Sequence, residues 1–169
     1  MTPDFSDFDW EELKKTVHLA VRCLDNVITR NKYPLPEIEE ATLATRKIGL
    51  GVMGWASALL YLGIAYDSEQ AEILARKVMK FITAEAEKAS IALAKERGVF
   101  PEWQHSTWHD SGIRIRNAAL TTIAPTGTIC NLANCSSGIE PCFAYAYTRR
   151  VDIGTPNEQV LEIRSKELA

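Results

Sequence analysis

The residues best suited to binding an anion lie in one short segment, Pro125, Thr126, Gly127, Thr128 and Ile129. The segment follows 118–124, an apolar and threonine-rich run that is compatible with a buried strand. Two hydroxyls flank a glycine, and a turn at the end of a strand can aim several backbone N–H groups at one point. A helix that begins near Ile129 would add its dipole. The pattern predicts a phosphate- or carboxylate-binding loop, although composition alone fits a simple polar β-turn equally well.

A second hydroxyl-rich turn follows a few residues later, at Ser136, Ser137 and Gly138. Ser136 and Ser137 are candidates for secondary contacts with the same anion. The alternating residues of 143–151 predict a strand that closes with Arg149 and Arg150. These two arginines fit either an anion contact or a salt bridge to a neighbouring element.

The cysteines and histidines do not form a recognisable metal or catalytic set. Four cysteines, at positions 23, 130, 135 and 142, are too few for a disulfide scaffold in a chain of this length. Cys130 and Cys135 have a poor zinc spacing without a second pair. His18 is interpreted as a helix-flank residue, and the His/Trp cluster of 99–115 as a surface loop anchored by aromatics rather than as the lining of a site. No metal ligand and no catalytic residue is assigned.

Periodic apolar residues and end signals predict helices at about 10–29, from 36 through Ala41, at 55–62 and at 67–97. Asp9 with Glu12, and Asp67 with Gln70, supply the capping signals of the first and last of these helices. The glycine-rich stretch 46–54 predicts close backbone approach or tight turning between two helices. Its spacing is not that of the dinucleotide-binding fingerprint.

Composition fits one soluble, cytosolic domain. The chain has 169 residues, 46% hydrophobic and 24% charged, which allows a sizeable core. A formal charge of −3 gives no cationic excess for a nucleic-acid polymer or an anionic membrane surface. No apolar run approaches the roughly 20 residues of a membrane span, and the acidic N-terminus lacks the features of a signal peptide.

Three stretches, in order and correctly spaced, resemble the large chain of ribonucleotide reductases. They are 46–54 (RKIGLGVMG), 116–129 (RNA leading into TTIAPTGTI) and 135–151 (CSSGIEP followed by AYTRRV). The resemblance covers about residues 9–151. The Pro-Thr-Gly-Thr form of the loop is more similar to the adenosylcobalamin-dependent class II branch than to the di-iron branch.

The resemblance implies an α/β fold with predominant helix, a partial segment of the family's ten-stranded α/β barrel. Residues 1–151 would be this barrel segment and 152–169 a divergent or truncated tail. Family members replace the ribose 2′-hydroxyl with hydrogen by radical chemistry. The loop that matches Pro125 to Ile129 binds the phosphate of their ribonucleotide substrate.

The departures from the family pattern limit what this chain is expected to do alone. The radical cysteine of the family lies in an Asn-Pro-Cys-type motif, and nothing of that form occurs here. The redox cysteine pair and the effector site belong to regions upstream. We therefore expect the isolated chain to be inactive, with adenosylcobalamin bound by the complete enzyme and not by this chain alone.

Two readings of the function remain open at this point. The first is a part of a reductase that pairs with a missing N-terminal polypeptide or self-associates, because a partial barrel leaves apolar faces uncovered. The second is a non-catalytic nucleotide-binding or interaction module that retains the loop. Neither reading involves a nucleic-acid polymer or a membrane.

Overall fold

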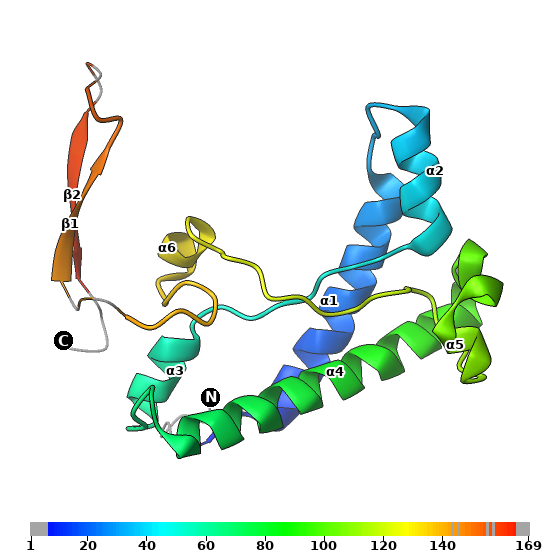
Figure 1. Cartoon of the computed structure of the whole chain (residues 1–169), viewed down its shortest axis with the longest axis horizontal. Helices are drawn as coiled ribbons and strands as arrows, with labels where there is room; N and C mark the ends of the chain where they lie inside the picture. Colours follow the sequence, from blue (N-terminus) through cyan, green and yellow to red (C-terminus); the bar gives the residue numbers. More distant parts are fainter. Residues whose placement is uncertain (1–6, 143, 145, 155, 157, 165–169) are drawn as a thin grey trace. The chain divides into compact units, whose positions relative to one another are not determined.

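Helices make up most of the regular structure in the computed structural model of this chain (Figure 1). The structure describes residues 7–142, 144, 146–154, 156 and 158–164. The chain forms two compact units, the first from residues 1–51 and 72–123 and the second from 52–71 and 124–169. The helix-rich character predicted from the sequence is confirmed.

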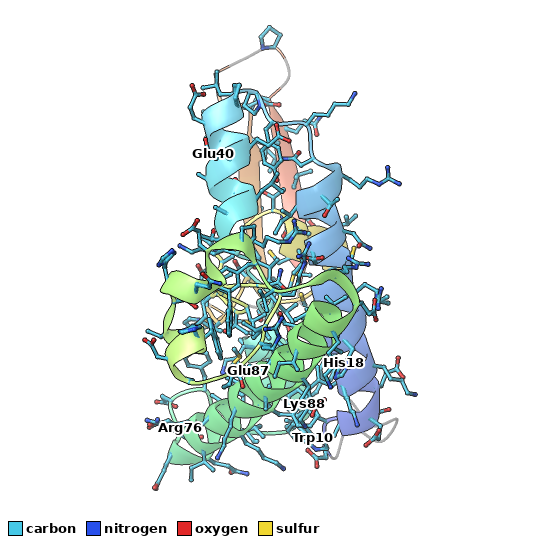
Figure 2. The ribbon with its side chains drawn as sticks, turned by 90° about the vertical axis from the view of Figure 1, so that its right-hand side faces the viewer. Trp10, His18, Glu40, Arg76, Glu87 and Lys88 are labelled. Atoms are coloured by element: carbon cyan, nitrogen blue, oxygen red, sulfur yellow. The ribbon has the colours of Figure 1, made fainter. Side chains whose placement is uncertain are left out.

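The first unit is built on two long helices, α1 (Trp10–Arg30) and α4 (Glu69–Arg97). They contact each other along their length, through an edge-on ring contact between Trp10 and Phe81 and a 2.6 Å ion pair between Arg22 and Glu96. Figure 2 shows His18 of α1 and Lys88 of α4 where the two helices meet. Buried aliphatic residues of both helices form the core of this unit, among them Val17, Val21, Ile82, Ala86 and Leu93.

The predicted N-cap is correct for α1 and lies one residue too early for α4. The Asp9 side chain accepts a hydrogen bond from the Glu12 N–H (3.0 Å), which confirms the N-cap of α1. At the start of α4 the Ser68 hydroxyl accepts from the Ala71 N–H (3.2 Å), so the cap is Ser68 and not Asp67. Serine caps as well as aspartate, and the sequence offers both side by side.

Pro36 begins α2 (Pro36–Thr45), as expected for a proline in the first helical turn. The predicted loop at 99–115 is wrong in detail, because it contains a 3₁₀ helix at Pro101–His105 and a short α5 at Thr107–Asp110. Its anchoring by aromatics is confirmed, since the indole N–H groups of Trp103 and Trp108 donate to backbone carbonyls of Ile113 and Ala118 at 2.8 and 2.9 Å.

Two extended segments of the first unit run side by side and in parallel. The N–H groups of Ile48 and Leu50 donate to the carbonyls of Ala119 and Leu120 at 2.9 and 2.8 Å. The predicted strand at 118–124 is nevertheless not a regular strand, because only one parallel bridge forms, between Leu50 and Thr121. Among the described residues no third segment extends this pairing, and an isolated pair of strands has little stability of its own.

Gly49 allows the close approach that the glycine-rich stretch predicted. A Cβ atom at position 49 would lie 2.8 Å from Cγ2 of Thr122, closer than real Cβ contacts come. Gly49 is therefore required by the pairing of the two segments rather than by a turn between helices.

The second unit contains α3 (Trp55–Tyr61), α6 (Ile129–Ala133) and an antiparallel pair of strands, β1 (Ala146–Val151) and β2 (Gln159–Arg164). The helix expected near Ile129 is confirmed, although it has only five residues. Strand β1 confirms the predicted strand at 146–151, residue 144 is not part of a strand, and residues 143 and 145 lie outside the described residues. Strand β2 lies in the region predicted to be a tail. None of the helices that the structure describes could cross a membrane.

We predict that Gly49→Ala lowers the free energy of unfolding by about 1–3 kcal/mol, because overpacking forces neighbouring atoms to shift. Adding Thr122→Ala should restore most of the loss, since it removes the atom that the new methyl group meets. Gly127→Ala is the matched control, because a Cβ there meets nothing within 4 Å. Denaturant unfolding measures all four chains, and a Gly49→Ala chain as stable as the wild type would refute this account.

Candidate functional site

The predicted anion loop is a tight turn that leads directly into α6. Thr126 adopts a left-handed conformation with φ 52°, which is uncommon for a β-branched residue. Its carbonyl accepts from the Cys130 N–H (3.1 Å), and the Thr128 carbonyl accepts from the Asn131 N–H (3.1 Å). These bonds close the turn and fix the direction in which the backbone enters the helix.

The second predicted turn, 136–138, lies against the first and holds it. The Gly138 N–H donates to Oγ1 of Thr126 (2.7 Å), and the Ser137 hydroxyl donates to the carbonyl of Pro125. A Cβ at Gly138 would lie 3.0 Å from the carbonyl oxygen of Ala124, and its φ of 45° also favours glycine. The two turns thus form one structure, and the hydroxyl of Ser137 is engaged in holding it.

The start of α3 holds the second turn in the same way. The N–H groups of Gly54 and Trp55 donate to the carbonyls of Ser136 (2.8 Å) and Gly138 (3.2 Å). Ser57 and Ser136 exchange two hydrogen bonds, in which each backbone N–H donates to the hydroxyl of the other residue at 3.2 and 2.9 Å. Sequence reasoning missed Ser57. The only available signal was its place in the first turn of a predicted helix, where backbone N–H groups lack intrahelical acceptors.

Three consecutive backbone donors of the loop remain available. The N–H groups of Gly127, Thr128 and Ile129 have no hydrogen-bond acceptor within the described part of the chain, and all three residues are exposed. A five-residue helix has only a small dipole, so the donors themselves matter more than α6. Chemically, such a loop can donate several hydrogen bonds to the oxygens of one anion.

A buried ionic cluster organises the first unit. The Asp25 carboxylate is fully buried and accepts from Arg46 Nε (2.9 Å), Arg97 Nη1 (2.9 Å) and Asn117 Nδ2 (3.1 Å). Burial acts to raise the pKa of Asp25, but the hydrogen bond and charge of Arg46, together with Arg97 and Asn117, outweigh it and leave this pKa below its ordinary value. We call Asp25, Arg46, Arg97, Arg116 and Asn117 the Asp25 cluster.

Arg116 joins the Asp25 cluster to the end of α4. Its Nη1 contacts the carbonyls of Arg97, Gly98 and Val99 at 3.2, 3.2 and 3.4 Å, while its Nε lies 3.5 Å from Asp25 Oδ1. Burial first, and then the charge of Arg46, lower the pKa of Arg116, against the opposing effect of Asp25. Arg46 and Arg116, which belong to two of the stretches that carry the family resemblance, therefore both lie against the Asp25 carboxylate.

The remaining candidate side chains are not gathered into a site. His18 pairs with Glu85 at 2.9 Å, and the rings of His109 and Trp103 are in contact. Arg150 is exposed without an ion pair to any described residue, and the side chain of Arg149 is not described. Within the described ranges, no three His, Cys, Asp or Glu residues are placed to hold a metal ion.

The helix-rich fold agrees with the comparison to protein families. The model of the ribonucleotide reductase barrel domain matches residues 2–114 and 112–168. The chain belongs to this family.

Individual relatives identify the branch. A vitamin B12-dependent ribonucleoside-diphosphate reductase of Thermoplasma acidophilum is 51% identical over 160 residues, which cover 95% of this chain and 20% of that protein. Its counterpart from Mycobacterium tuberculosis is 52% identical over 143 residues, 85% of this chain and 20% of that protein. A ribonucleoside-diphosphate reductase subunit alpha of Chlamydia muridarum is 35% identical, over 83% of this chain and 17% of that protein.

These relatives confirm the resemblance to the cobalamin-dependent branch, since the identity to its members is higher than to the subunit alpha. The chain spans about a fifth of the length of the relatives it matches. The match to the barrel domain extends to residue 168 and so includes the region expected to be a tail.

We predict that Asp25→Asn lowers the free energy of unfolding at pH 7 by about 3–5 kcal/mol, because it leaves the buried Arg46 without its counter-charge. The folded-state pKa of Asp25 is depressed, so its stabilising effect is present above the unfolded pKa. It is lost as pH falls below roughly 4 toward the folded pKa. The difference in stability between the two chains should therefore shrink on acidification.

Denaturant unfolding between pH 7 and pH 3 measures this difference. Glu72→Gln is the matched control, because the ion pair of Glu72 with Arg76 is exposed and contributes little. An Asp25→Asn loss no larger than that of Glu72→Gln would contradict the assignment of Asp25 as the organising charge.

Proposed function

We propose that this chain is part of the catalytic barrel of a ribonucleotide reductase and that its Pro125–Ile129 loop binds the phosphate of a ribonucleoside diphosphate. Membership in the barrel-domain family supports the first part. The observation that carries the second is the row of three N–H groups, at the exposed residues Gly127, Thr128 and Ile129, that have no acceptor in the part of the chain that the structure describes. The substrate class follows the names of the relatives, which are diphosphate reductases.

The loop suits a phosphate because its donors are held in place before any ligand arrives. Hydrogen bonds to an ionised phosphate oxygen are about twice as strong as neutral ones. A loop that already holds its binding conformation loses less entropy on binding. The turn at 136–138 supports the loop through Thr126 and Pro125, which favours such a fixed geometry. Ser136 and Ser137 act in this proposal mainly as supports, and direct contacts from them to the ligand stay a prediction.

The role proposed for this chain is binding and orientation rather than radical chemistry. Its sequence holds no Asn-Pro-Cys-type motif, so the thiyl radical and the reducing cysteine pair are assigned to the rest of the enzyme. The substrate would lose its 2′-hydroxyl there while its phosphate remains on the loop. We assign no catalytic residue to this chain.

The relatives depend on vitamin B12, and in the complete enzyme adenosylcobalamin would supply the initiating radical. His18 pairs with Glu85 and His109 packs on Trp103, so the described contacts of these two histidines are with other residues of this chain. No cobalamin contact is therefore assigned to this chain.

The parallel contact between 48–50 and 119–122 supports a place in the ten-stranded barrel. We propose that these segments become strands of the barrel when other parts of the enzyme extend the pairing, with residues 1–151 forming the barrel segment and 152–169 a divergent tail. Exposed apolar side chains of the second unit would then be covered, notably Leu132, whose exposed fraction is 89%, and Ile153, whose exposed fraction is 70%. The partner is the N-terminal part of the reductase or, in its absence, a second copy of this chain.

We predict that the chain binds inorganic diphosphate and cytidine diphosphate and that Thr128→Glu raises the Kd about fivefold. The cause is repulsion between the new carboxylate and the ligand, worth about 1 kcal/mol at a hydrated surface. Thr128 is exposed and precedes α6 directly, so the variant should fold normally. Isothermal titration calorimetry measures the Kd.

The matched control for this titration is Thr128→Gln, which has the same shape without the charge and should bind within about twofold of the wild type. If Thr128→Glu and Thr128→Gln weakened binding equally, the cause would be the size of the new side chain and not repulsion between its charge and the ligand. A wild-type chain that binds neither probe would overturn the proposed phosphate site.

We also predict that the chain self-associates at high concentration and that Leu132→Glu shifts it toward the monomer, because a charge at an exposed apolar position opposes burial. Static light scattering across a concentration series measures the mass. A wild-type chain that stays strictly monomeric would contradict the proposal that its exposed apolar side chains are covered by a partner.

A further inference from the structure

Ser57 is a buried serine that touches the supports of the loop and not the loop itself. Its exposed fraction is 5%, and it occupies the third position of α3. Its hydroxyl accepts from the Ser136 N–H (2.9 Å), while its own N–H donates to the Ser136 hydroxyl (3.2 Å). Among the buried polar residues of the described chain, Ser57 is the one that lies next to the candidate phosphate site. It does not belong to the sequence motifs from which that site was predicted.

The reciprocal pair fixes Ser136 from one direction, and the helix start fixes it from another. The Gly54 N–H donates to the Ser136 carbonyl at 2.8 Å. The N–H, carbonyl and hydroxyl of Ser136 are therefore all bonded to the first turn of α3. Gly54 has a φ of 80°, and a Cβ there would lie 3.1 Å from Cβ of Cys135, so the close approach of the two segments requires glycine.

The position of Ser136 determines what the next two residues can reach. Ser137 and Gly138 bond to Pro125 and Thr126, and Thr126 has the left-handed φ of 52°. A threonine persists in this region only when its surroundings hold it there. If Ser136 moved, the Gly138 N–H would lose Oγ1 of Thr126, and the backbone could relax toward ordinary φ values. The three free donors that follow Thr126 would then lose their fixed positions.

We propose that Ser57 is a positioning residue for the phosphate loop, which it holds through Ser136 in the conformation that binds the ligand. This inference rests on the proposed function and adds to it a residue about 70 positions earlier in the chain. Ser57 makes no contact with the ligand. It acts on affinity by keeping the unbound loop in its binding conformation, so that little rearrangement is needed on binding.

The test is titration of the whole 169-residue chain with inorganic diphosphate and with cytidine diphosphate. Ser57→Ala should raise both Kd values about fivefold to tenfold, the ratio that the loss of one buried hydrogen bond corresponds to. Amide hydrogen exchange at Gly138 should become faster in the same variant, because its acceptor on Thr126 is no longer held. Ser57→Thr, which keeps the hydroxyl, should bind like the wild type.

Ser90→Ala is the matched control for a purely structural effect. Ser90 is also a fully buried helical serine, and its hydroxyl bonds Asn117 twice, but it lies in the first unit. This variant should lose a similar amount of stability and leave both Kd values unchanged. Ser136→Ala removes only the acceptor of the Ser57 N–H and should raise the Kd values by less than Ser57→Ala does. If the Ser57→Ala chain fails to fold, the Kd values of the Ser136→Ala chain test the inference in its place.

The outcomes separate this inference from the proposed function. If the wild type binds and Thr128→Glu weakens binding, but Ser57→Ala and Ser136→Ala leave the Kd values unchanged, the positioning role is overturned and the phosphate site stands. Equal weakening by Ser57→Ala and Ser90→Ala would reduce Ser57 to a general stabilising residue. If the wild type binds neither probe, both proposals fail together.

Discussion

The charge of Asp25 is the constraint on which the first unit depends. This carboxylate has no access to water, so its charge must be balanced by protein groups. The balancing groups come from the end of α2, the end of α4 and the segment after α5. Satisfying one carboxylate therefore fixes the relative positions of four stretches of chain that are far apart in sequence.

The Asp25 cluster carries more positive than negative charge, and backbone carbonyls compensate for the difference. Arg46 donates to the carbonyl of Asp25 itself (2.9 Å), and Arg116 donates to carbonyls at the C-terminal end of α4, where the helix dipole is negative. Arg46 adopts a left-handed φ of 46°, which terminates α2 and turns its side chain into the Asp25 cluster. The next residues then begin the parallel pairing with 119–122. Arg46 thus both balances the charge of Asp25 and sets the direction in which the chain leaves α2.

Local signals explain what the sequence predicted well. The four main helices follow from apolar periodicity and end signals, and α6 follows from the turn before it. The cap of α4 was placed one residue too early because Asp67 and Ser68 are equally good caps. The strand at 118–124 was overpredicted because composition cannot say whether enough neighbouring strands are present. The short helices within 99–115 were missed because they lack a full period of apolar residues.

The candidate site shows the same division between local and distant information. The loop residues and the second turn are visible as motifs, whereas their support by Ser57 depends on a contact that spans 79 residues. Asp25 and Asn117 are likewise 92 residues apart. A single sequence gives no signal for such pairs, because each residue alone is ordinary in its own helix or turn.

The distance between Asp25 and Asn117 also bears on how the protein is made. A ribosome releases α1 before Arg97, Arg116 and Asn117 emerge, so the carboxylate must stay hydrated until these partners have been made. Helices α1 and α2 can form early, but they cannot bury Asp25 without its later partners. The Asp25 cluster can therefore be completed only after residue 117 has left the exit tunnel.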